Sequence, residues 1–216
     1  MYNRLQVDLN EYGESFYNEM IPGIIDELTS LGLVTIQDGA TCVFVPGSEY
    51  PLILRKSDGG YGYDSTDMAA LSYRIRDLKR DWVIILTDAG QNSHFEMIFD
   101  TGRAAGWVSN ATRLNHIGFG VVCGEDGKRF KTRSGETVRL VDLLDAAKDR
   151  MQESLMQRLA EGKTPLTVEE IPDAAQKIGY GAVKYFDLRQ NPVTNYVFSY
   201  DRMLDTRGDT AVYLLF

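Results

Sequence analysis

The spacing of apolar residues divides the chain into two parts of different character. Within residues 51–123, short apolar runs alternate with segments that have helical spacing, whereas residues 138–184 hold two longer amphipathic segments. Apolar residues four positions apart predict helices, and short apolar runs bounded by Gly, Pro or polar clusters predict strands. Strands that alternate with helices are typical of a parallel sheet with crossover helices. We therefore expect an α/β fold followed by an α-helical region.

The first part of the chain contains several strands and helices in this pattern. We expect a helix that ends near Gly32, strands at 41–45, 52–54, 82–86 and 114–123, and helices that begin near Thr66 and at Ser93. Ser93 and Glu96 predict a capping box for the second of these helices. The run 82–86 is almost continuously apolar, which is typical of a parallel strand covered on both faces.

The second part of the chain is helical and ends in an apolar run. One helix is expected from about Val138 to Ala160, and a second is expected to begin after a Thr167–Glu170 capping box and to reach Lys184. The last seven residues, 210–216, are mostly apolar up to the final one. Because chain termini are usually exposed and polar, this ending predicts a segment of a longer chain.

Composition narrows the possible classes of protein. The 216 residues carry a formal net charge of −8, which argues against a generic nucleic-acid coat protein. No apolar run approaches the roughly 20 residues needed to cross a bilayer, so no membrane partner is expected. Cys42 and Cys123 are expected to be reduced, buried thiols of a cytoplasmic protein. With only two histidines, His94 and His116, a zinc hydrolase is disfavoured and no metal ligands are assigned.

Ligands of parallel α/β sheets bind at the carboxyl ends of the strands, where three loops of this chain are expected to meet. In the first loop, Tyr63 and Asp67 lie four positions apart across a helix start. A carboxylate there can accept two parallel N–H bonds from a guanidinium, or pair with an amine. The alternative is that Asp67 caps the helix, and the residues alone favour the cap.

The second loop holds His94, and the strand that leads into the third loop holds His116. His94 stands beside a helix N-terminus, which disfavours its cation, so we expect a neutral donor or acceptor in contact with ligand. The alternative is a solvated turn. Gly118 and Gly120 flank an aromatic residue in the strand, where glycine often marks close approach of a ligand to the backbone. His116 by itself is better interpreted as a satisfied, partly buried side chain than as a catalyst.

The third strand leads into a basic loop. Four cations fall within the six residues 128–133, in a chain that is acidic overall. Cations in this arrangement suit a polyphosphate, although a solvated charged loop is the alternative. The strand–GxxxxGK[ST]–helix order of a P-loop is not found here.

Taken together, these stretches resemble the catalytic domain of the arginyl-tRNA synthetases, a class I family. The resemblance runs in order over nearly the whole chain, and it is carried by Gly13-Glu14-Ser15-Phe16-Tyr17, Lys56-Ser57-Asp58-Gly59-Gly60-Tyr61, Gly120-Val121-Val122, Gly124-Glu125-Asp126-Gly127-Lys128, Phe130-Lys131-Thr132-Arg133-Ser134-Gly135, Leu140-Val141-Asp142-Leu143-Leu144, Gly179-Tyr180-Gly181-Ala182-Val183-Lys184-Tyr185 and Thr210-Ala211-Val212-Tyr213-Leu214. It implies a parallel Rossmann-like, HUP-type half-domain. Residues 1–50 would be a connecting segment, 51–137 the second half of the nucleotide-binding fold, and 138–216 a helical region leading to an anticodon-binding domain.

The resemblance also assigns roles to residues. It implies that arginine is held by Tyr63, Asp67 and Gln91, the last of which lies 24 positions after Asp67. ATP, with Mg²⁺, would be bound by His116, Gly118, Gly120 and Val121. The basic loop would be the degenerate KMSKS loop, with Lys128, Lys131 and Arg133 as its catalytic cations. Contact with tRNA(Arg) would begin at Gly208, Asp209 and Thr210.

One departure from the family limits what the chain is expected to do alone. The HIGH signature is absent, since His116-Ile117-Gly118-Phe119 fails at its fourth position and lies too late in the fold. We therefore expect the 216 residues by themselves to be inactive without the remaining domains of a parent enzyme. The alternatives are a natural half-synthetase that binds arginine, ATP or a partner without catalysis, and an unrelated doubly wound nucleotide-binding enzyme.

Overall fold

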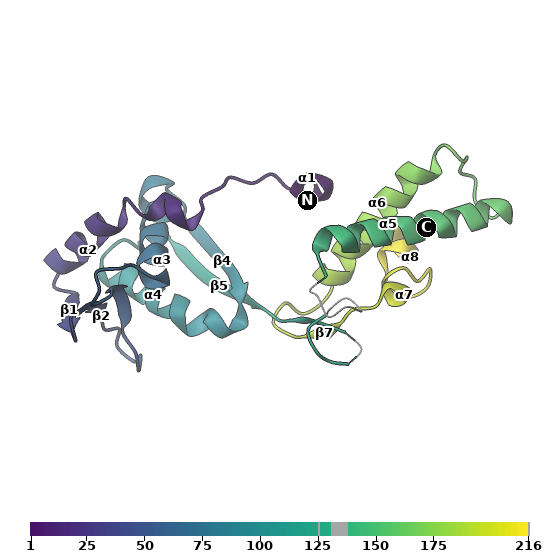
Figure 1. Cartoon of the computed structure of the whole chain (residues 1–216). Coiled ribbons are helices and arrows are strands. Elements are labelled where there is room, and N and C mark those ends of the chain that lie inside the picture. The colour runs from purple at the N-terminus through teal and green to yellow at the C-terminus, as the bar shows by residue number, and fades with distance from the viewer. Residues whose placement is uncertain (125, 131–137, 216) are drawn as a thin grey trace. The chain divides into compact units, whose positions relative to one another are not determined.

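The computed structural model describes residues 1–124, 126–130 and 138–215 (Figure 1). The chain forms two compact units. One comprises residues 10–119, and the other combines residues 1–9 with 120–216. We call them the 10–119 unit and the 120–216 unit, and each has its own hydrophobic core. The expected boundary at residue 50 lies inside the first of these units.

The 10–119 unit begins with helices and a small antiparallel sheet. A 3₁₀ helix η1 (Glu14–Tyr17) precedes α2 (Ile21–Ser30). Two residues after α2, Gly32 has the left-handed conformation with φ of +72°, as predicted for the end of this helix. Strands β1 (Val34–Gln37), β2 (Ala40–Val43) and β3 (Leu52–Arg55) then pair antiparallel in the order β1-β2-β3. The first of these strands was not expected from the sequence.

The pairing of β3 corrects the expectation that the 52–54 strand opens a parallel sheet. It pairs antiparallel with β2, with Ile53 opposite Cys42. The physical reason is visible in its burial, because Leu52 and Leu54 are fully buried whereas Ile53 between them is 41% exposed. Such alternation belongs to an antiparallel sheet with one covered face, and not to a parallel strand covered on both.

A parallel pair follows, joined by a crossover helix as predicted. Strand β4 (Trp82–Asp88) pairs in register with β5 (Arg113–Phe119), and η3 (Ala89–Gln91) and α4 (Asn92–Ala104) connect them. The expectation that both faces of the 82–86 strand are covered is wrong. Val83 packs into the core, whereas Ile84 and Leu86 on the opposite face are 49% and 61% exposed.

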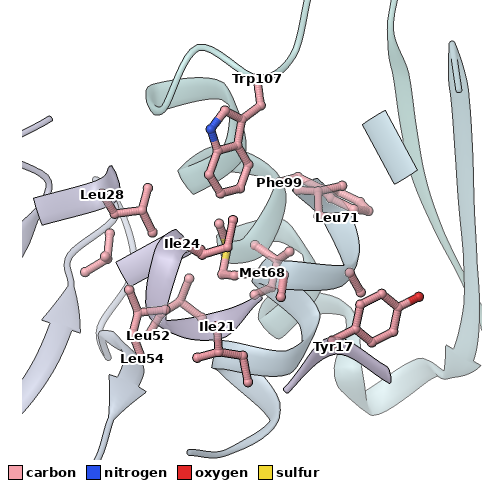
Figure 2. Close-up of a cluster of buried hydrophobic side chains, with 14 of the residues drawn as sticks. Tyr17, Ile21, Ile24, Leu28, Leu52, Leu54, Met68, Leu71, Phe99 and Trp107 are labelled. Carbon is pink, nitrogen blue, oxygen red and sulfur yellow. The ribbon is translucent and has the colours of Figure 1, made fainter. Parts of the chain in front are cut away.

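Helices α2, α3 and α4 enclose the core of this unit together with the covered face of the antiparallel sheet. Helix α3 (Tyr63–Ser72) continues into a π-helical turn, η2 (Tyr73–Asp77). Figure 2 shows side chains from these helices, from β3 and from the segment after α4 packed together: Ile21, Ile24, Leu28, Leu52, Leu54, Met68, Leu71, Phe99 and Trp107. Helices α3 and α4 approach closely, because a Cβ at Gly102 would lie 2.8 Å from a methyl carbon of Leu71. The packing of α3 against α4 is thereby set in the core.

The starts of α3 and α4 differ from those expected. Helix α3 begins at Tyr63 rather than near Thr66, with Gly62 as its N-cap. Helix α4 begins at Asn92, and its N-cap makes no side-chain hydrogen bond, so the predicted Ser93–Glu96 capping box is wrong. Instead, the Asn92 amide donates to the Glu96 carboxylate at 2.8 Å across one turn. The Glu96 carboxylate thus has Asn92, and not Ser93, as its partner.

The 120–216 unit is mainly helical, as predicted. Its two long helices, α5 (Leu140–Ala160) and α6 (Ile171–Leu188), pack against each other, and the unit also contains α1 (Tyr2–Leu5), α7 (Tyr200–Met203), α8 (Ala211–Leu215) and the parallel strands β6 (Val122–Cys123) and β7 (Tyr196–Val197). Half of the predicted box before α6 is present, since the Glu170 carboxylate accepts from the Thr167 N–H at 2.8 Å. Across the described ranges, no helix has the length and apolar character to cross a membrane.

Two glycines of α6 offer a matched test of the helix packing. A Cβ at Gly179 would lie 2.8–2.9 Å from backbone atoms of Ala147 and Lys148 on α5, whereas a Cβ at Gly181 would meet only a methyl of Leu215 at 3.9 Å. We expect Gly179→Ala to lower the free energy of unfolding by about 1–3 kcal/mol through overpacking. Gly181→Ala should leave it unchanged or raise it by up to about 1 kcal/mol through helix propensity. Urea denaturation measures both, and equal effects would contradict the packing.

Candidate functional site

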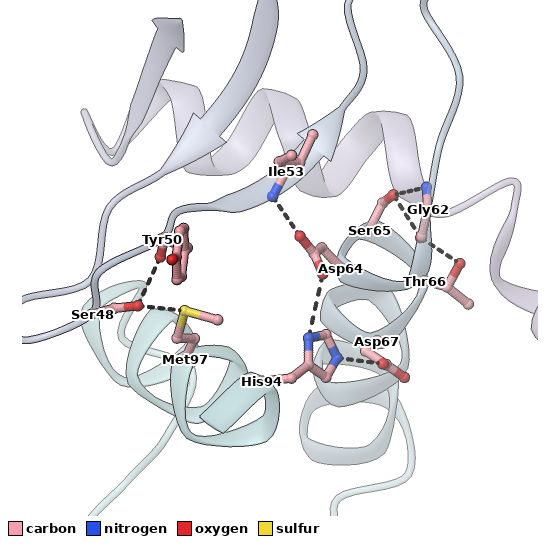
Figure 3. Close-up of polar contacts among 10 residues, drawn as sticks. All are labelled: Ser48, Tyr50, Ile53, Gly62, Asp64, Ser65, Thr66, Asp67, His94 and Met97. Carbon is pink, nitrogen blue, oxygen red and sulfur yellow. Dashed lines mark hydrogen bonds and ion pairs between the residues drawn. The ribbon is translucent and has the colours of Figure 1, made fainter. Parts of the chain in front are cut away.

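The loop 58–62 and the start of α3 determine how the predicted arginine-binding carboxylate is presented. At this start, Ser65 Oγ accepts from the Gly62 N–H at 2.9 Å, and Thr66 Oγ1 donates to the Gly62 carbonyl at 3.1 Å (Figure 3). Helix α3 begins at Tyr63 with Gly62 as its N-cap, so the alternative that Asp67 is the cap is wrong. Asp67 lies in the second turn, and its carboxylate makes other contacts.

An ionic cluster joins α3 to α4 at this position. The His94 ring of α4 lies between two carboxylates of α3, with Nε2 at 2.8 Å from Asp67 Oδ2 and Nδ1 at 3.3 Å from Asp64 Oδ1 (Figure 3). The other oxygen of Asp64 accepts from the backbone N–H of Ile53 on β3 at 2.5 Å. All three charged side chains are partly buried, with exposed fractions of 21–30%. The cluster therefore links one strand and two helices.

His94 is a cation, so the expectation of a neutral ring is wrong. Hydrogen bonds to Asp64 first, and then to Asp67, raise the pKa of His94 to about 9, against the opposing effect of burial. A neutral ring has one N–H and could donate to one carboxylate only, whereas the imidazolium donates to both. The expected neutral form rested on the helix dipole, which is worth only about 0.3–1 kcal/mol near a surface. Two carboxylates in direct contact outweigh it.

The other two predicted arginine-binding residues lie at the starts of the same helices. Tyr63 is the first residue of α3, one turn before Asp67, and its side chain is 72% exposed. Residues four apart on a helix share a face. Gln91 ends η3 and is the N-cap of α4, one turn before His94. The structure thus brings Asp67 and His94 into contact. Tyr63 lies one turn before Asp67 on α3, and Gln91 lies one turn before His94 at the start of α4.

His116 forms a satisfied network within the 10–119 unit. Its Nε2 lies 2.8 Å from Thr87 Oγ1 and its Nδ1 lies 3.0 Å from Asn92 Oδ1, while its ring stacks on Phe95 at 5.1 Å. Because the Asn92 amide N–H₂ donates to Glu96, its oxygen faces the ring, and Nδ1 carries the proton. The interpretation of His116 as a satisfied, partly buried side chain is confirmed, and its role toward ATP stays a prediction.

The glycines of the predicted adenine-binding strand are explained by close approach of the chain to itself. A Cβ at Gly118 would lie 2.6 Å from the Cα of Ala89, and one at Gly120 would lie 2.5 Å from backbone atoms of Thr194. The Gly120 N–H donates to the Pro192 carbonyl at 2.8 Å. A side chain at either position would displace backbone, so the geometry by itself does not require a ligand there.

The neighbouring Val121 belongs to the 120–216 unit. Its N–H, a donor that adenine recognition would use, donates to Asn195 Oδ1 at 2.7 Å. Exchange of that internal hydrogen bond would accompany any nucleotide contact at Val121. The ATP-binding roles of Gly118, Gly120 and Val121 stay predictions.

The basic loop is described only at its beginning. The Gly124 N–H donates to the Lys128 carbonyl at 2.8 Å, and the Phe130 N–H donates to the Val122 carbonyl at 2.8 Å. The side chain of Lys128 is exposed to solvent. Lys131 and Arg133 lie outside the described residues, so the catalytic roles of the three cations stay predictions.

The predicted tRNA-binding residues have internal partners. The Asp209 carboxylate accepts from the Tyr185 hydroxyl, which raises the pKa of Tyr185, and it pairs with Arg189 at 3.2 Å. Thr210 is buried, donates to the Asp205 carbonyl at 2.6 Å and accepts from the Tyr213 N–H at 3.1 Å. Both side chains stabilise the turn that Gly208 allows with its φ of +81°. Contact with tRNA stays a prediction.

Neither cysteine nor acidic clusters provide a metal site in the part of the chain that the structure describes, where no group of three or more potential ligands could hold an ion. Binding of Mg²⁺ together with ATP stays a prediction, and no chemical step is assigned to the ion. Cys42 and Cys123 are buried free thiols, as predicted.

Asp64 is the residue of this site that the sequence did not reveal. Its carboxylate stands three positions before Asp67 on α3, which places both on one side of the helix. That spacing, with a histidine at the start of the next helix, is a signal that could have pointed to it. The bond from Ile53 has no such signal, because it comes from a backbone N–H on a separate strand.

Comparison with known proteins gives a consistent result over the whole chain. Residues 1–200 match the family model described as tRNA synthetases class I (R), catalytic domain. An arginine–tRNA ligase of Cyanothece sp. is 52% identical over all of this chain and 38% of its own length. The chloroplastic/mitochondrial arginine–tRNA ligase of Arabidopsis thaliana is 51% identical over all of this chain and 34% of its own length. The chain thus spans little more than a third of these relatives.

Solved structures agree with the sequence relatives. The crystal structure of arginyl-tRNA synthetase from Plasmodium falciparum superposes with a TM-score of 0.85 at 38% identity, and it covers 99% of this chain and 35% of that protein. The Thermus thermophilus arginyl-tRNA synthetase shares the fold, with a TM-score of 0.77 at 17% identity over 98% of this chain and 41% of that one.

The charge of His94 predicts a pH-dependent contribution to stability. The pKa rises from 6.5 to about 9 on folding, so the contribution is complete below pH 6.5 and is lost as the pH rises through about 9. We expect His94→Gln to lower the free energy of unfolding by on the order of 1–2 kcal/mol near neutral pH or below, allowing for solvent screening. The difference should fade above pH 9, as measured by urea denaturation across pH.

The control for this measurement is the same substitution in the Asp64→Asn/Asp67→Asn background. Because both carboxylates that bind the ring lose their charge there, the pH dependence of the difference should largely vanish. A difference that stays constant across the whole range would contradict the assignment of the imidazolium.

Proposed function

Because the chain belongs to the class I arginyl-tRNA synthetases, through their catalytic domain, we propose that it carries the guanidinium-binding part of an arginine site. The enzyme in which it acts would join L-arginine to tRNA(Arg) with ATP. The chain spans 34–38% of the relatives compared, so the rest of that site would come from residues beyond these 216.

The observation that carries the proposal is the Asp67 carboxylate and its setting. The Oδ2 oxygen of Asp67 is hydrogen-bonded to His94, and Oδ1 accepts no hydrogen bond from the described residues. Two carboxylates and one imidazolium leave the cluster with a net charge of −1, opposite to that of one guanidinium. A planar guanidinium suits a carboxylate held in one orientation better than an ammonium does, which would favour arginine over lysine.

The proposed reaction has two steps. An oxygen of the arginine carboxylate attacks the α-phosphorus of ATP, the bond to the β-phosphate oxygen breaks, and pyrophosphate leaves with arginyl-adenylate retained. A terminal ribose hydroxyl of tRNA(Arg) then attacks the activated carbonyl and releases AMP. The cations Lys128, Lys131 and Arg133 would stabilise the charge that develops on the phosphates in the first step. Residues from 208 onward would meet tRNA.

The nucleotide would approach Gly118 near the end of β5 and the segment that follows this strand. There the backbone of Gly120 and Val121 would recognise adenine, and His116 of β5 would contribute to the same site. Since the Val121 N–H already donates to Asn195, nucleotide binding would need to displace or share that hydrogen bond. The family uses ATP as a substrate, and no resident organic cofactor is required by the proposal.

The arginine site is tested by titrating the chain with L-arginine and following the resonances of α3 and α4 by NMR. We expect weak binding that Asp67→Asn weakens at least tenfold, equivalent to about 1.4 kcal/mol, because an ionised acceptor is lost. L-citrulline, which is neutral and similar in shape, should bind more weakly than arginine.

The matched control is Asp100→Asn. Asp100 lies on α4 and pairs at the surface with Arg103, so its substitution changes the net charge equally without touching the cluster. Equal loss of arginine binding in the two variants would show that charge alone, and not the Asp67 site, is responsible.

The activity of the chain by itself is a separate prediction. We expect the purified 216-residue chain to show no arginine-dependent exchange of ATP with pyrophosphate, even with tRNA(Arg) present, because the HIGH signature is absent from it. A full-length arginine–tRNA ligase serves as the positive control. Exchange above background in the chain alone would refute this prediction and the division of the site between segments.

A further inference from the structure

His94 connects the proposed arginine-binding carboxylate, through Asp64, to the backbone of β3. The Ile53 N–H of β3 donates to Asp64 Oδ2, His94 donates from Nδ1 to Asp64 Oδ1, and its Nε2 donates to Asp67 Oδ2 (Figure 3). The three links run in series from the antiparallel sheet through α3 and α4. They end on one oxygen of Asp67.

The ring at the centre of this series is itself held. Its edge packs against the Phe95 ring, with centroids 4.8 Å apart and an interplanar angle of 75°. Phe95 is buried in the core of the 10–119 unit. The ring therefore has packing on one side and carboxylates at both nitrogen atoms, which leaves it little freedom to rotate.

Asp67 needs such support because its side chain is otherwise free to turn. It stands on the surface of α3 with 30% of its side chain exposed. Two parallel hydrogen bonds from a guanidinium require the carboxylate plane to be aligned with the ligand before binding. A carboxylate held through one lone pair of Oδ2 keeps its plane fixed, while Oδ1 and the remaining lone pair of Oδ2 can accept the two bonds, so less conformational freedom is lost on binding.

We propose that His94 is a positioning residue for arginine: its protonated ring holds Asp67 through Oδ2 and aligns that carboxylate for the substrate guanidinium. This inference rests on the proposed function, in which Asp67 binds arginine. It assigns His94 a part in substrate recognition without contact to the substrate.

Charge and positioning make opposite predictions for a neutral residue at position 94. Removing the imidazolium leaves two carboxylates one turn apart with a net charge of −2, which would attract a cationic ligand more strongly. If attraction governed affinity, the substitution would tighten arginine binding. If alignment of Asp67 governs it, the substitution weakens binding, because repulsion turns Asp67 away from Asp64.

The experiment compares variants of the 216-residue chain in NMR titrations with L-arginine. We expect His94→Gln and His94→Lys each to weaken binding at least fivefold. Both replacements are flexible chains, and neither has the two donors on opposite sides of a rigid ring with which His94 contacts both carboxylates. The double variant Asp64→Asn/His94→Gln should recover part of the affinity, because the repulsion is gone and two amides can still bridge to Asp67. Arg103→Gln, which removes a cation bonded to a carboxylate on the same helix, is the matched control and should bind like the parent chain.

A spectroscopic signature separates positioning from a merely structural role. In the parent chain, the ¹⁵N resonances of His94 should show both ring nitrogens protonated and should shift when arginine is added. If His94 only stabilises the fold, His94→Gln lowers stability while the folded molecules bind arginine with parent affinity. That result, or tighter binding, overturns the inference.

The two proposals fail in different ways. If Asp67→Asn weakens arginine binding and His94→Gln does not, only the positioning role is overturned. If neither substitution changes the affinity, or the parent chain binds no arginine, the arginine site itself is overturned and the role of His94 with it.

Discussion

The packing of α3 against α4 is the constraint on which the 10–119 unit and its candidate site depend. In the core, Gly102 leaves room for Leu71, so the helices approach closely. At their starts, His94 of α4 lies between Asp64 and Asp67 of α3. The buried apolar contact sets the distance between the helices, and the ionic contact then sets the orientation of the side chains that face outward.

The same constraint explains why the candidate site is charged and yet ordered. A pair of carboxylates one turn apart would repel each other. The imidazolium between them offsets this repulsion, because it attracts both carboxylates. Partial burial strengthens these contacts relative to water. Attachment of Asp64 to the backbone of β3 extends the order to a third element. A ligand that replaces solvent at Asp67 therefore meets a carboxylate whose orientation is already determined.

Glycine has a different role in each region of the chain. At Gly102 and Gly179 it permits two helices to touch, and at Gly118 and Gly120 it permits one backbone segment to pass another. From the sequence, the glycines of the strand predict close approach of a ligand to the backbone. The sequence shows that these positions have no side chain, but it does not show what occupies the space. The segments that occupy it, at Ala89 and Thr194, are distant along the chain.

Much of the architecture was predicted from local pattern. The helix ending at Gly32, the parallel β4–β5 unit with its crossover helix, and the long helices α5 and α6 follow from apolar periodicity and glycine placement. The family was also recognised from ordered motifs. The pairing of β3 was not predicted, since a strand of four residues carries too little pattern to choose its partner or direction.

The candidate site, like the fold, was predictable from the sequence only in part. The sequence by itself determined which residue types are available: a tyrosine and two aspartates at the start of one helix, and a glutamine and a histidine at the start of another. Only the tertiary structure decided that His94 is a cation, that Asp67 is not a helix cap, and that Asp64 belongs to the site. The physical reason is that the charge of His94 depends on groups 27 and 30 positions earlier in the chain, and folding alone brings them within hydrogen-bond distance.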